Sequence, residues 1–499
     1  MDTEVLVVGA GPTGLVLALW LTRLGIRVRI IDKTAEPGIT SRALVVHART
    51  LEFYRQLGFA DGVVEAGLEF AAANFWARGK KAARVEFGGL GDVRTPYPYA
   101  LIYPQDAHER FLIERLEELD VRVERGTELI GFEEKSGSLV AHLSGSTCEA
   151  AFVAGCDGAR STVRDKLGIN FPGGTYEHLF YVADVEAEGP VMDGELHGSI
   201  DESDFVAVFP LKESGRARLI GTIRSESEKK RENLGWDDVS TGLLQRLRID
   251  VRRVHWFSTY QVHHRVASRF RQGRSFLLGD AAHIHSPVGG QGMNTGIGDA
   301  ANLAWKLAAV LRGRAPARLL DSYEPERIGF ARRLVATTDR AFQFITKSGR
   351  LAAHIRVHVA PRVLSAASRL RAVRRLMFRT VSQTAIDYRG SDLSEGRAGR
   401  ICGGDRLPWV ASDPDNFTPL ESLDWQVHVY GMATPALASA CRLRGLPLHV
   451  FPWTRNTAHA GFARDASYLV RPDGHVALAD PLHDPAHLER YLASALPGS

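Results

Sequence analysis

The stretch FLLGDAAHIHSPVGGQGMN, residues 276–294, combines an acidic side chain with several glycines. It predicts an apolar strand that ends near Asp280, which we expect to be buried, then a glycine-rich turn and a helix that begins near Met293. Such an arrangement would direct a carboxylate and the free backbone N–H groups of a helix N-terminus at one point. That point is suited to holding a polar cofactor.

A second glycine-rich stretch lies at the N-terminus. Residues 4–33, EVLVVGAGPTGLVLALWLTRLGIRVRIIDK, predict a strand, a glycine turn, a helix and a second strand that ends at Asp32. Gly9, Gly11 and Gly14 form the G-x-G-x-x-G pattern, in which the glycines allow a tight turn, close approach of a pyrophosphate and close helix–strand packing. Asp32 would accept hydrogen bonds from a ribose. The pattern predicts a dinucleotide site and leaves NAD(P) or FAD open.

A third stretch, FVAGCDGARSTVRDKLGI at residues 152–169, again places an apolar strand before an acidic residue. Asp157 and Gly158 follow the strand, and the next helix carries Arg160 and Arg164. A dehydrogenase that binds only NAD would not need a further strand and glycine turn so far along the chain. FAD is long enough to use one, so the distal glycines favour FAD.

Composition limits the other function classes. The 499 residues include 62 basic and 58 acidic side chains, a balance that argues against general nucleic-acid binding. The four cysteines form no C-x-x-C pair and no cluster with histidine, which argues against a metal site and a disulfide framework. We find no signal peptide and no apolar segment long enough for a bilayer. We therefore expect a cytoplasmic protein with no metal, nucleic-acid or membrane partner.

The motifs GAGPTG, CDGARSTVR and GDAAHIHSPVGGQGMN together resemble, in order and spacing, the class A flavoprotein monooxygenases. These are single-component FAD-dependent aromatic hydroxylases, and the resemblance covers most of residues 1–330. It implies FAD as cofactor and NADPH or NADH as a transient co-substrate. In the family, reduced flavin reacts with O2 to give a C4a-hydroperoxide, which hydroxylates an aromatic ring. The expected substrate is a phenolic or polycyclic, polyketide-type aromatic molecule.

The resemblance also implies which residues contact FAD. Asp280 would bond the ribityl chain, Gln105 would lie beside that chain, and Arg42 would lie near the pyrophosphate. The peptide N–H groups of the distal glycine turn would face the pyrimidine edge of the flavin, where a helix N-terminus favours negative charge. The full expected set is Gly9, Gly11, Pro12, Thr13, Gly14, Asp32, Lys33, Arg42, Gln105, Asp157, Gly158, Gly279, Asp280, Pro287, Gly290, Gly292, Met293 and Asn294.

Some residues near the motifs keep two interpretations. Arg49 is either a charge near the cofactor or a solvated helix charge. His283 and His285 lack a third metal ligand nearby, so we expect them to pack beside the flavin through hydrogen bonds. No catalytic acid or base can be chosen, because no tyrosine or histidine of residues 171–270 is tied to a motif.

The expected fold class is α/β. A Rossmann-like FAD-binding domain would comprise residues 1–170 and 271–394, and a mostly antiparallel β-sheet substrate domain would be inserted at residues 171–270. Residues 395–499 would form a small thioredoxin-like α/β domain, by resemblance to the phenol-hydroxylase-like branch, but without C-x-x-C. The insert carries aromatic residues that either pack the sheet or stack on substrate: Tyr181, Phe205, Phe209, Trp256 and Phe257.

The arginine-rich helical region at residues 331–380 has three interpretations, namely solvated helix faces, a subunit contact or an anionic ligand. A homodimer is therefore left open. Two alternative functions also remain at this point. A Baeyer–Villiger or epoxidising monooxygenase on the same scaffold would carry the same three motifs. A non-catalytic flavin-binding module would bind FAD but would not consume NAD(P)H.

Overall fold

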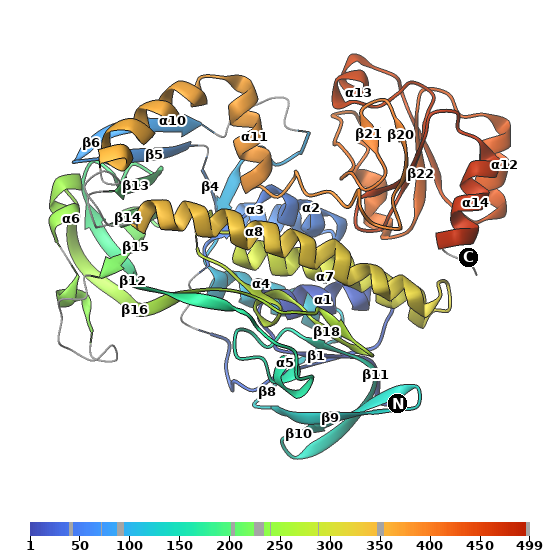
Figure 1. The fold of residues 1–499 in the computed structure, drawn as a ribbon, viewed down its shortest axis with the longest axis horizontal. Coiled ribbons are helices and arrows are strands. Elements are labelled where there is room, and N and C mark those ends of the chain that lie inside the picture. The colour runs from blue at the N-terminus through green and yellow to red at the C-terminus, as the bar shows by residue number, and fades with distance from the viewer. Residues whose placement is uncertain are drawn as a thin grey trace.

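The structure is a computed structural model that describes residues 1–38, 43–70, 72–86, 94–200, 205–223, 234–239, 241–287, 289–346 and 354–495. The expected cofactor residue Arg42 lies outside these residues. Figure 1 shows three large sheets. A green sheet lies at one end of the molecule, an orange and red sheet lies at the other end, and helices α7 and α8 run between them.

The first sheet contains the N-terminal strand. Its strands are β1 Thr3–Val8, β2 Val28–Asp32, β8 Val123–Arg125, β9 Leu129–Lys135, β10 Ser138–Leu143, β11 Ser146–Gly155, β17 Arg271–Gln272 and β18 Ser275–Leu277. The path β18-β11-β1-β2-β8 is parallel throughout. Helices α1 Pro12–Arg23 and α7 Gly292–Leu311 pack against each other beside it and bury nearly all their apolar side chains. The strand, helix and strand predicted at residues 4–33 are confirmed.

The second sheet is mostly antiparallel, in the order β19-β16-β12-β15-β14-β13-β5-β6. Its strands are β5 Ala72–Ala77, β6 Lys80–Glu86, β12 Gly173–Glu188, β13 Leu196–Ile200, β14 Phe205–Pro210, β15 Arg216–Ile223, β16 Asp250–Val266 and β19 His283–Ile284. Only the β13–β5 pair is parallel among the pairs of this sheet that the structure describes. Strands β5, β6 and β19 come from outside residues 171–270. Helix α6 Gly242–Leu247 packs in the apolar cluster on one face.

A small sheet joins these two, with strands β3 Val45–Val46, β4 Leu68–Phe70 and β7 Ala100–Ile102. The remaining helices of this part are α2 Ala48–Gln56, α3 Ala60–Ala66, α4 Gln105–Glu117, α5 Thr162–Lys166, α8 Tyr323–Thr346, α10 Ala360–Ser368 and α11 Arg371–Val381. The helices predicted for residues 331–380 are present in the described part of that region. No helix of the described ranges is long and apolar enough to cross a membrane.

The C-terminal sheet has the order β21-β20-β25-β24-β22-β23. Its strands are β20 Glu395–Ala398, β21 Ile401–Cys402, β22 Gln426–Tyr430, β23 Leu448–Phe451, β24 Ser467–Val470 and β25 Val476–Asp480. Helices α12 Pro435–Leu443, α13 Arg455–Ala460 and α14 Pro485–Ala495 accompany it. Strands β24 and β25 pair antiparallel as a hairpin, around a turn in which Gly474 has φ +72°. Only glycine adopts that backbone conformation readily.

Buried ion pairs join the C-terminal sheet to the rest of the molecule. Arg471, in the hairpin, donates to both carboxylate oxygens of Glu326 on α8, at 2.8 and 3.0 Å. Arg49 on α2 donates to the backbone carbonyl of Asp473 at 2.6 Å and pairs with Glu52 at 2.8 Å. Arg49 is only 4% exposed, so its interpretation as a solvated helix charge is wrong. Glu52 lies three residues after Arg49, on the same face of α2, and this face is turned toward the hairpin that contains Asp473.

Candidate functional site

The three glycine-rich motifs meet at one edge of the parallel sheet. Because β1, β11 and β18 run in the same direction, the residues that follow them lie at the same carboxyl edge. Those residues include Gly9, Asp157 and Gly279, and Asp32 ends the neighbouring strand β2 at this edge. The carboxyl edge of an open parallel sheet is where ligands of such folds bind. The sheet order therefore brings together motifs from the beginning, middle and later part of the chain.

Glycine is required where these motifs pack on each other. Gly9 has φ +102°, and an added Cβ would lie 2.9 Å from the Cα of Asp157 and would collide with the Cys156 carbonyl. Gly279 has φ +57°, and its Cβ would lie 2.7 Å from the Oγ1 of Thr13. The N-terminal motif thus contacts both other motifs. The three sequence patterns describe one structural unit.

Several features of this edge fit a bound dinucleotide. Gly11 is the N-cap of α1, and a Cβ placed there would have no atom within 4 Å, so the backbone is open to a ligand. The Oδ1 of Asp157 and the Nη2 of Arg125 are buried, and neither finds a hydrogen-bond partner in the part of the chain that the structure describes. Buried polar atoms rarely lack partners in a folded protein. The edge therefore has unused hydrogen-bonding capacity beside an accessible helix N-terminus.

Asp32 is held beside the glycine turn. Its Oδ2 accepts from the backbone N–H of Ala10 at 2.7 Å, and its Oδ1 accepts from the backbone N–H of Thr34 at 2.8 Å. Arg125, paired with Asp32 across β2 and β8, places its Nη1 3.8 Å from this carboxylate. Sequence reasoning missed Arg125, because β8 is short and carries no motif. The adjacent residue Lys33 is exposed.

Gln105 begins α4 close to the same edge. Its Nε2 donates to the Oε1 of Glu109 at 2.7 Å, one turn along the helix. Burial raises the pKa of Glu109, and the hydrogen bond from Gln105 counteracts part of that effect. The amide oxygen of Gln105 is not used in this pair. Gln105 could therefore bond a ligand while Glu109 orients it.

Asp280 differs from its expected environment. The side chain is exposed, not buried, because β18 ends at Leu277 and Asp280 lies in a short 3-10 turn, Gly279–Ala281, beyond the strand. The apolar residues before Asp280 correctly predicted the strand, but the strand ends three residues before Asp280 and does not bury it. The exposed Asp280 carboxylate lies at the carboxyl edge of the sheet, where ligands of such folds bind. Pro287 is also exposed, and its carbonyl accepts from the N–H of Gly290 at 3.0 Å.

The distal glycine turn is fixed by Asn294. Its Nδ2 donates to the carbonyls of Val45 and Gly290, both at 2.8 Å. Its Oδ1 accepts from the backbone N–H of His47 at 2.9 Å and from the hydroxyl of Thr50 at 2.8 Å. All hydrogen-bonding groups of the Asn294 side chain are therefore used within the protein. Any contact of Asn294 with a ligand would come from its backbone. Gly292 and Met293, at the start of α7, are partly exposed.

His47 is a further residue of this region that sequence reasoning missed. Its Nε2 lies 2.8 Å from the carbonyl of Gly289, and the residue is 2% exposed. Burial lowers the pKa of His47 to about 4, so the ring is neutral at pH 7. In the sequence, His47 stands directly before the segment that forms α2, but no pattern connects it with the turn at Gly289, more than two hundred residues later.

A buried charge network supports the turn at Gly279. Asp299 on α7 accepts from the N–H of Gly279 at 3.0 Å, from the Nε2 of His283 at 2.7 Å and from the Nε of Arg327 at 2.6 Å. Burial alone would raise the pKa of Asp299, but the charge of Arg327 and the hydrogen bond from His283 lower it. His283 thus packs through a hydrogen bond, as expected. Within the described ranges, no three His, Cys, Asp or Glu side chains are grouped as metal ligands.

The middle motif is tied to the distal motif by Arg164. This buried arginine donates to the carbonyls of Ala281 at 3.1 Å and Ala159 at 3.0 Å, and its guanidinium carbon lies 4.1 Å from the ring centroid of Phe171. Asp157 accepts from the N–H of Val163 at 3.1 Å, and burial raises its pKa. Arg160, by contrast, is exposed. Arg164 therefore serves the structure of the edge, and Arg160 is the accessible one.

The second sheet turns one face toward the distal turn. We call this face, carrying Phe180, Phe205, Phe209, Trp256 and Tyr260, the aromatic face. Phe209 packs with Leu44 and Val45, and an added Cβ on Gly290 would lie 3.0 Å from the Cβ of Val45. The aromatic face is thereby continuous with the cradle formed by the motifs. Arg218 and Asp184 form an ion pair on it, at 2.6 and 2.7 Å.

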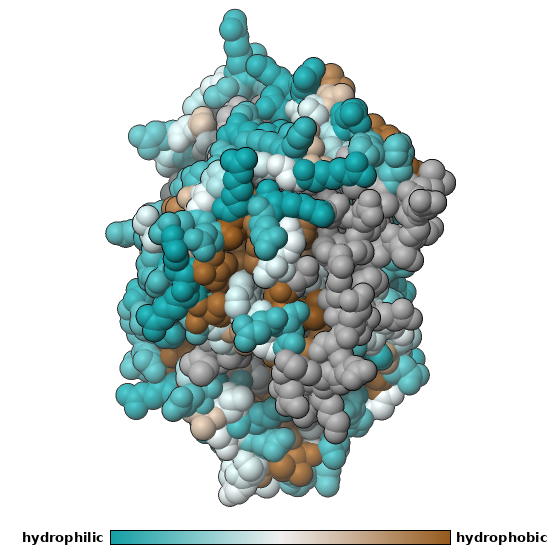
Figure 2. Space-filling view, turned by 90° about the vertical axis from the view of Figure 1, so that its left-hand side faces the viewer, coloured by the Kyte–Doolittle hydropathy of each residue, from teal (hydrophilic) through white to brown (hydrophobic). Residues whose placement is uncertain are grey.

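The five aromatic residues singled out in the sequence lie on two faces. Phe205, Phe209 and Trp256 are on the aromatic face, whereas Tyr181 and Phe257 stack on the opposite face with ring centroids 6.1 Å apart. Successive residues of a strand point to opposite sides of a sheet, so the neighbours Trp256 and Phe257 are separated. Figure 2 looks onto this end of the molecule, where the surface is largely hydrophilic with apolar residues in its central part.

Comparison with known proteins agrees with this geometry. A family model described as FAD binding domain matches residues 2–338. The 6-methylpretetramide 4-monooxygenase of Streptomyces rimosus is 36% identical over 416 residues, covering 80% of this chain and 72% of that protein. Pentachlorophenol 4-monooxygenase of Sphingobium chlorophenolicum is 34% identical over 428 residues, covering 82% and 76%. The structure of OxyS anhydrotetracycline hydroxylase from Streptomyces rimosus covers 100% of both chains with a TM-score of 0.79 and 28% identity.

Proposed function

We propose a substrate for this chain, which belongs to the FAD binding domain family and is a flavin-dependent aromatic monooxygenase. The proposed substrate is a phenolic or polycyclic, polyketide-type aromatic molecule, which the protein hydroxylates. NADPH or NADH would supply two electrons and O2 would supply the oxygen atom. The balanced reaction converts an aromatic C–H, NAD(P)H, H⁺ and O2 into the aromatic C–OH, NAD(P)⁺ and water. Bound FAD would supply this redox chemistry, by the C4a-hydroperoxide route that the resemblance to the family implies.

One observation carries this proposal. The aromatic face adjoins Val45, and Val45 contacts the distal glycine turn through Gly290. A flat apolar ring bound against the aromatic face would therefore lie next to the turn where the pyrimidine end of the flavin is expected. Stacking on such side chains favours an aromatic substrate. The Arg218–Asp184 pair gives the same face polar groups that could orient a hydroxylated ring.

The cofactor residues expected from the sequence are part of the proposal. Gly11 and the N-terminus of α1 would hold the pyrophosphate, Asp32 would bond a ribose, and Asp280 with Gln105 would bond the ribityl chain. The unpaired Oδ1 of Asp157 and Nη2 of Arg125 would complete the polar contacts of this edge. These residues bind and orient the cofactor, and the aromatic face excludes water from the reacting ring.

The division of the chain into domains is likewise a proposal. In residues 395–499, β22 and β23 are parallel and β24 and β25 form an antiparallel hairpin beside β22. This βαβ unit followed by a hairpin and a C-terminal helix supports a thioredoxin-like fold. Its cysteines Cys402 and Cys441 are free and do not form C-x-x-C, so we assign this unit a structural role.

The test combines reduction and oxygen incorporation. Purified protein is expected to contain FAD that denaturation releases, to oxidise NAD(P)H slowly alone and to do so faster with the correct phenol from a library. With ¹⁸O2, the product should be heavier by one labelled oxygen atom. Label entering from water instead would overturn the hydroxylase proposal. Flavin binding without NAD(P)H oxidation for any phenol would favour a non-catalytic module, and an ester or epoxide product would favour the other two alternatives.

A matched pair of variants locates the substrate. Trp256→Ala removes a ring from the aromatic face, so the KM for the stimulating phenol should rise by about tenfold, because a buried aromatic contact contributes on the order of 1.5 kcal/mol or more. Phe257→Ala removes the adjacent ring from the opposite face and should lower thermal stability while leaving that KM nearly unchanged. Equal KM values in the two variants would show that the substrate does not bind on the aromatic face.

A further inference from the structure

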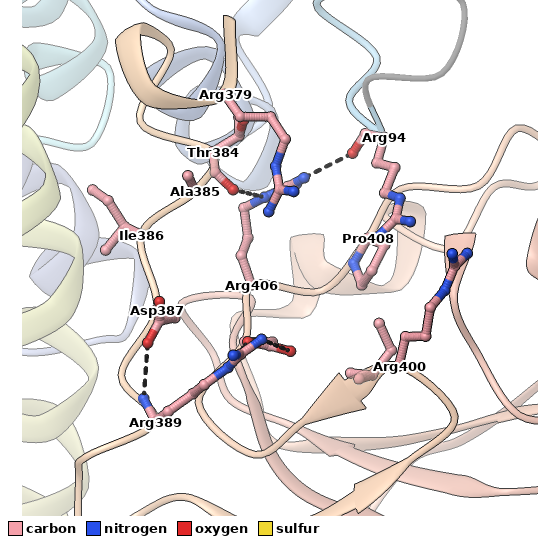
Figure 3. A pocket seen from close by; sticks show the side chains of 12 residues that line it. Arg94, Arg379, Thr384, Ala385, Ile386, Asp387, Arg389, Arg400, Arg406 and Pro408 are labelled. Carbon is pink, nitrogen blue, oxygen red and sulfur yellow. Dashed lines mark hydrogen bonds and ion pairs between the residues drawn. The ribbon is translucent and has the colours of Figure 1, made fainter. Parts of the chain in front are cut away.

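A cavity lined by arginines lies between α11 and the C-terminal sheet (Figure 3). Its volume is about 340 Å³, within the range of small-molecule sites. The connecting segment at residues 384–389 forms one wall, and residues 400–408 form another. We call it the arginine cavity, after the five arginines in its lining: Arg94, Arg379, Arg389, Arg400 and Arg406.

Positive charge in the arginine cavity exceeds the negative charge that could balance it. The acidic residues in its lining are Asp387 and Asp405, and Arg406 also pairs with Glu52, which lies outside the lining, at 3.0 Å. Arg389 occupies both oxygens of Asp405, at 2.7 and 3.1 Å, and Asp405 also accepts from the N–H of Cys402 at 2.9 Å. Among the residues described by the structure, Arg379 and Arg400 have no carboxylate partner. Arginines without counter-charges therefore remain around the cavity.

The arginines also converge in space. Arg94 and Arg400 both donate to the carbonyl of His459, Arg94 at 3.2 Å. Arg406 donates to the carbonyl of Arg94 at 2.9 Å and to that of Thr384 at 3.2 Å, as the dashed lines in Figure 3 show. Burial lowers the pKa of Arg406, the charge of Glu52 opposes this, and the charges of Arg49, Arg379 and Arg94 add to the lowering, so that the pKa is about 10. Like charges held together in this way favour a bound anion.

We propose that the arginine cavity binds the diphosphate group of a nucleotide. Guanidinium groups form paired, charge-assisted hydrogen bonds to phosphate oxygens, and several of them around one cavity match a group with two adjacent phosphates. Arg389 and Arg406 are paired with Asp405 and Glu52, so the donors for a phosphate come mainly from Arg379 and Arg400. The diphosphate can come from a nicotinamide dinucleotide or from a free nucleoside diphosphate. The site itself does not depend on the hydroxylation chemistry proposed above.

The test is calorimetric titration of the FAD-loaded full-length protein with inorganic pyrophosphate at low salt. Binding is expected, with an affinity that falls as salt rises, because the contacts are ionic. Arg379→Gln and Arg400→Gln, both at exposed positions, should each weaken binding by about tenfold. Arg371→Gln, an exposed arginine of α11 outside the cavity lining, is the matched control and should bind like the unaltered protein.

Competition identifies the source of the diphosphate. Displacement of pyrophosphate by NADPH or NADH, together with a raised KM for that nucleotide in Arg379→Gln, would assign the site to the nicotinamide dinucleotide. Displacement by ADP alone would assign it to a free nucleoside diphosphate. Absence of pyrophosphate binding by the unaltered protein, or equal affinity in all variants, would overturn the proposal. Labelled oxygen in the product is measured separately, so failure of this site and failure of the hydroxylase proposal are distinguishable.

Discussion

Arg471→Met should strongly destabilise the attachment of the C-terminal sheet. Arg471 is fully buried and donates to two carboxylates, that of Glu326 at 2.8 and 3.0 Å and that of Asp473 at 3.1 and 2.6 Å. Methionine fills similar apolar volume but leaves both acids without this cation. Removing one partner of a buried ion pair typically costs about 3–5 kcal/mol. We expect the lower end, about 3 kcal/mol, because Lys306 still contacts Glu326 at 2.7 Å.

The cost should also depend on pH. Burial would raise the pKa of Glu326 and of Asp473, but the charge of Arg471 holds both below their ordinary values. Lowered carboxyl pKa values add stability that is present above the unfolded pKa values, about 4, and is lost as pH falls through the folded values. In the variant both pKa values rise, so the acids become protonated more easily. The loss of unfolding free energy caused by Arg471→Met should therefore be largest near pH 7 and smaller at pH 5.

The assay is scanning calorimetry together with hydrogen exchange of the hairpin at residues 467–480. Arg471→Met should lower the transition temperature and increase exchange in the hairpin. Arg444→Met is the control, because Arg444 pairs with Glu489 at the surface of the same C-terminal unit, and exposed ion pairs contribute little. Transition temperatures that fall equally in the two variants would refute the conclusion that the buried network holds this sheet in place.

Three further predictions follow from the site and the core. Asp280→Asn should weaken FAD binding by about tenfold in a fluorescence titration, since a hydrogen bond to a charged group contributes about 1.5–3 kcal/mol, and unchanged affinity would exclude Asp280 as a ligand. Gly11→Val should fold but lose FAD, whereas Gly14→Val should not fold because its Cβ would collide with the Gly9 carbonyl; soluble yield and flavin content separate the two. Burial lowers the pKa of His428 to about 3, below the unfolded value near 6.5, so stability should fall as pH drops below 6.5, by about 3 kcal/mol at pH 4. His428→Asn should flatten the denaturation midpoint against pH, and an equal slope would contradict this.

Local patterns in the sequence determined much of the fold. The periodicity of residues 4–33 predicted β1, α1 and β2, and the mostly antiparallel sheet expected at residues 171–270 is present there as β12, β14, β15 and β16. The three motifs were sufficient for the family resemblance, which the comparisons confirm. These features succeed because they depend on backbone conformation and on side-chain period over a few residues.

Tertiary structure decided which side chains share a face or a partner. The sequence placed Trp256 and Phe257 side by side, but only the pairing of β16 with β12 shows which of them lies on the aromatic face. The sequence was compatible with a solvated Arg49, but in the structure Arg49 is buried against the hairpin and donates to the carbonyl of Asp473. The arginine cavity likewise joins Arg94 and Arg400, which are far apart in the chain. Such contacts arise from the packing of distant segments, and no local pattern in one sequence encodes that packing.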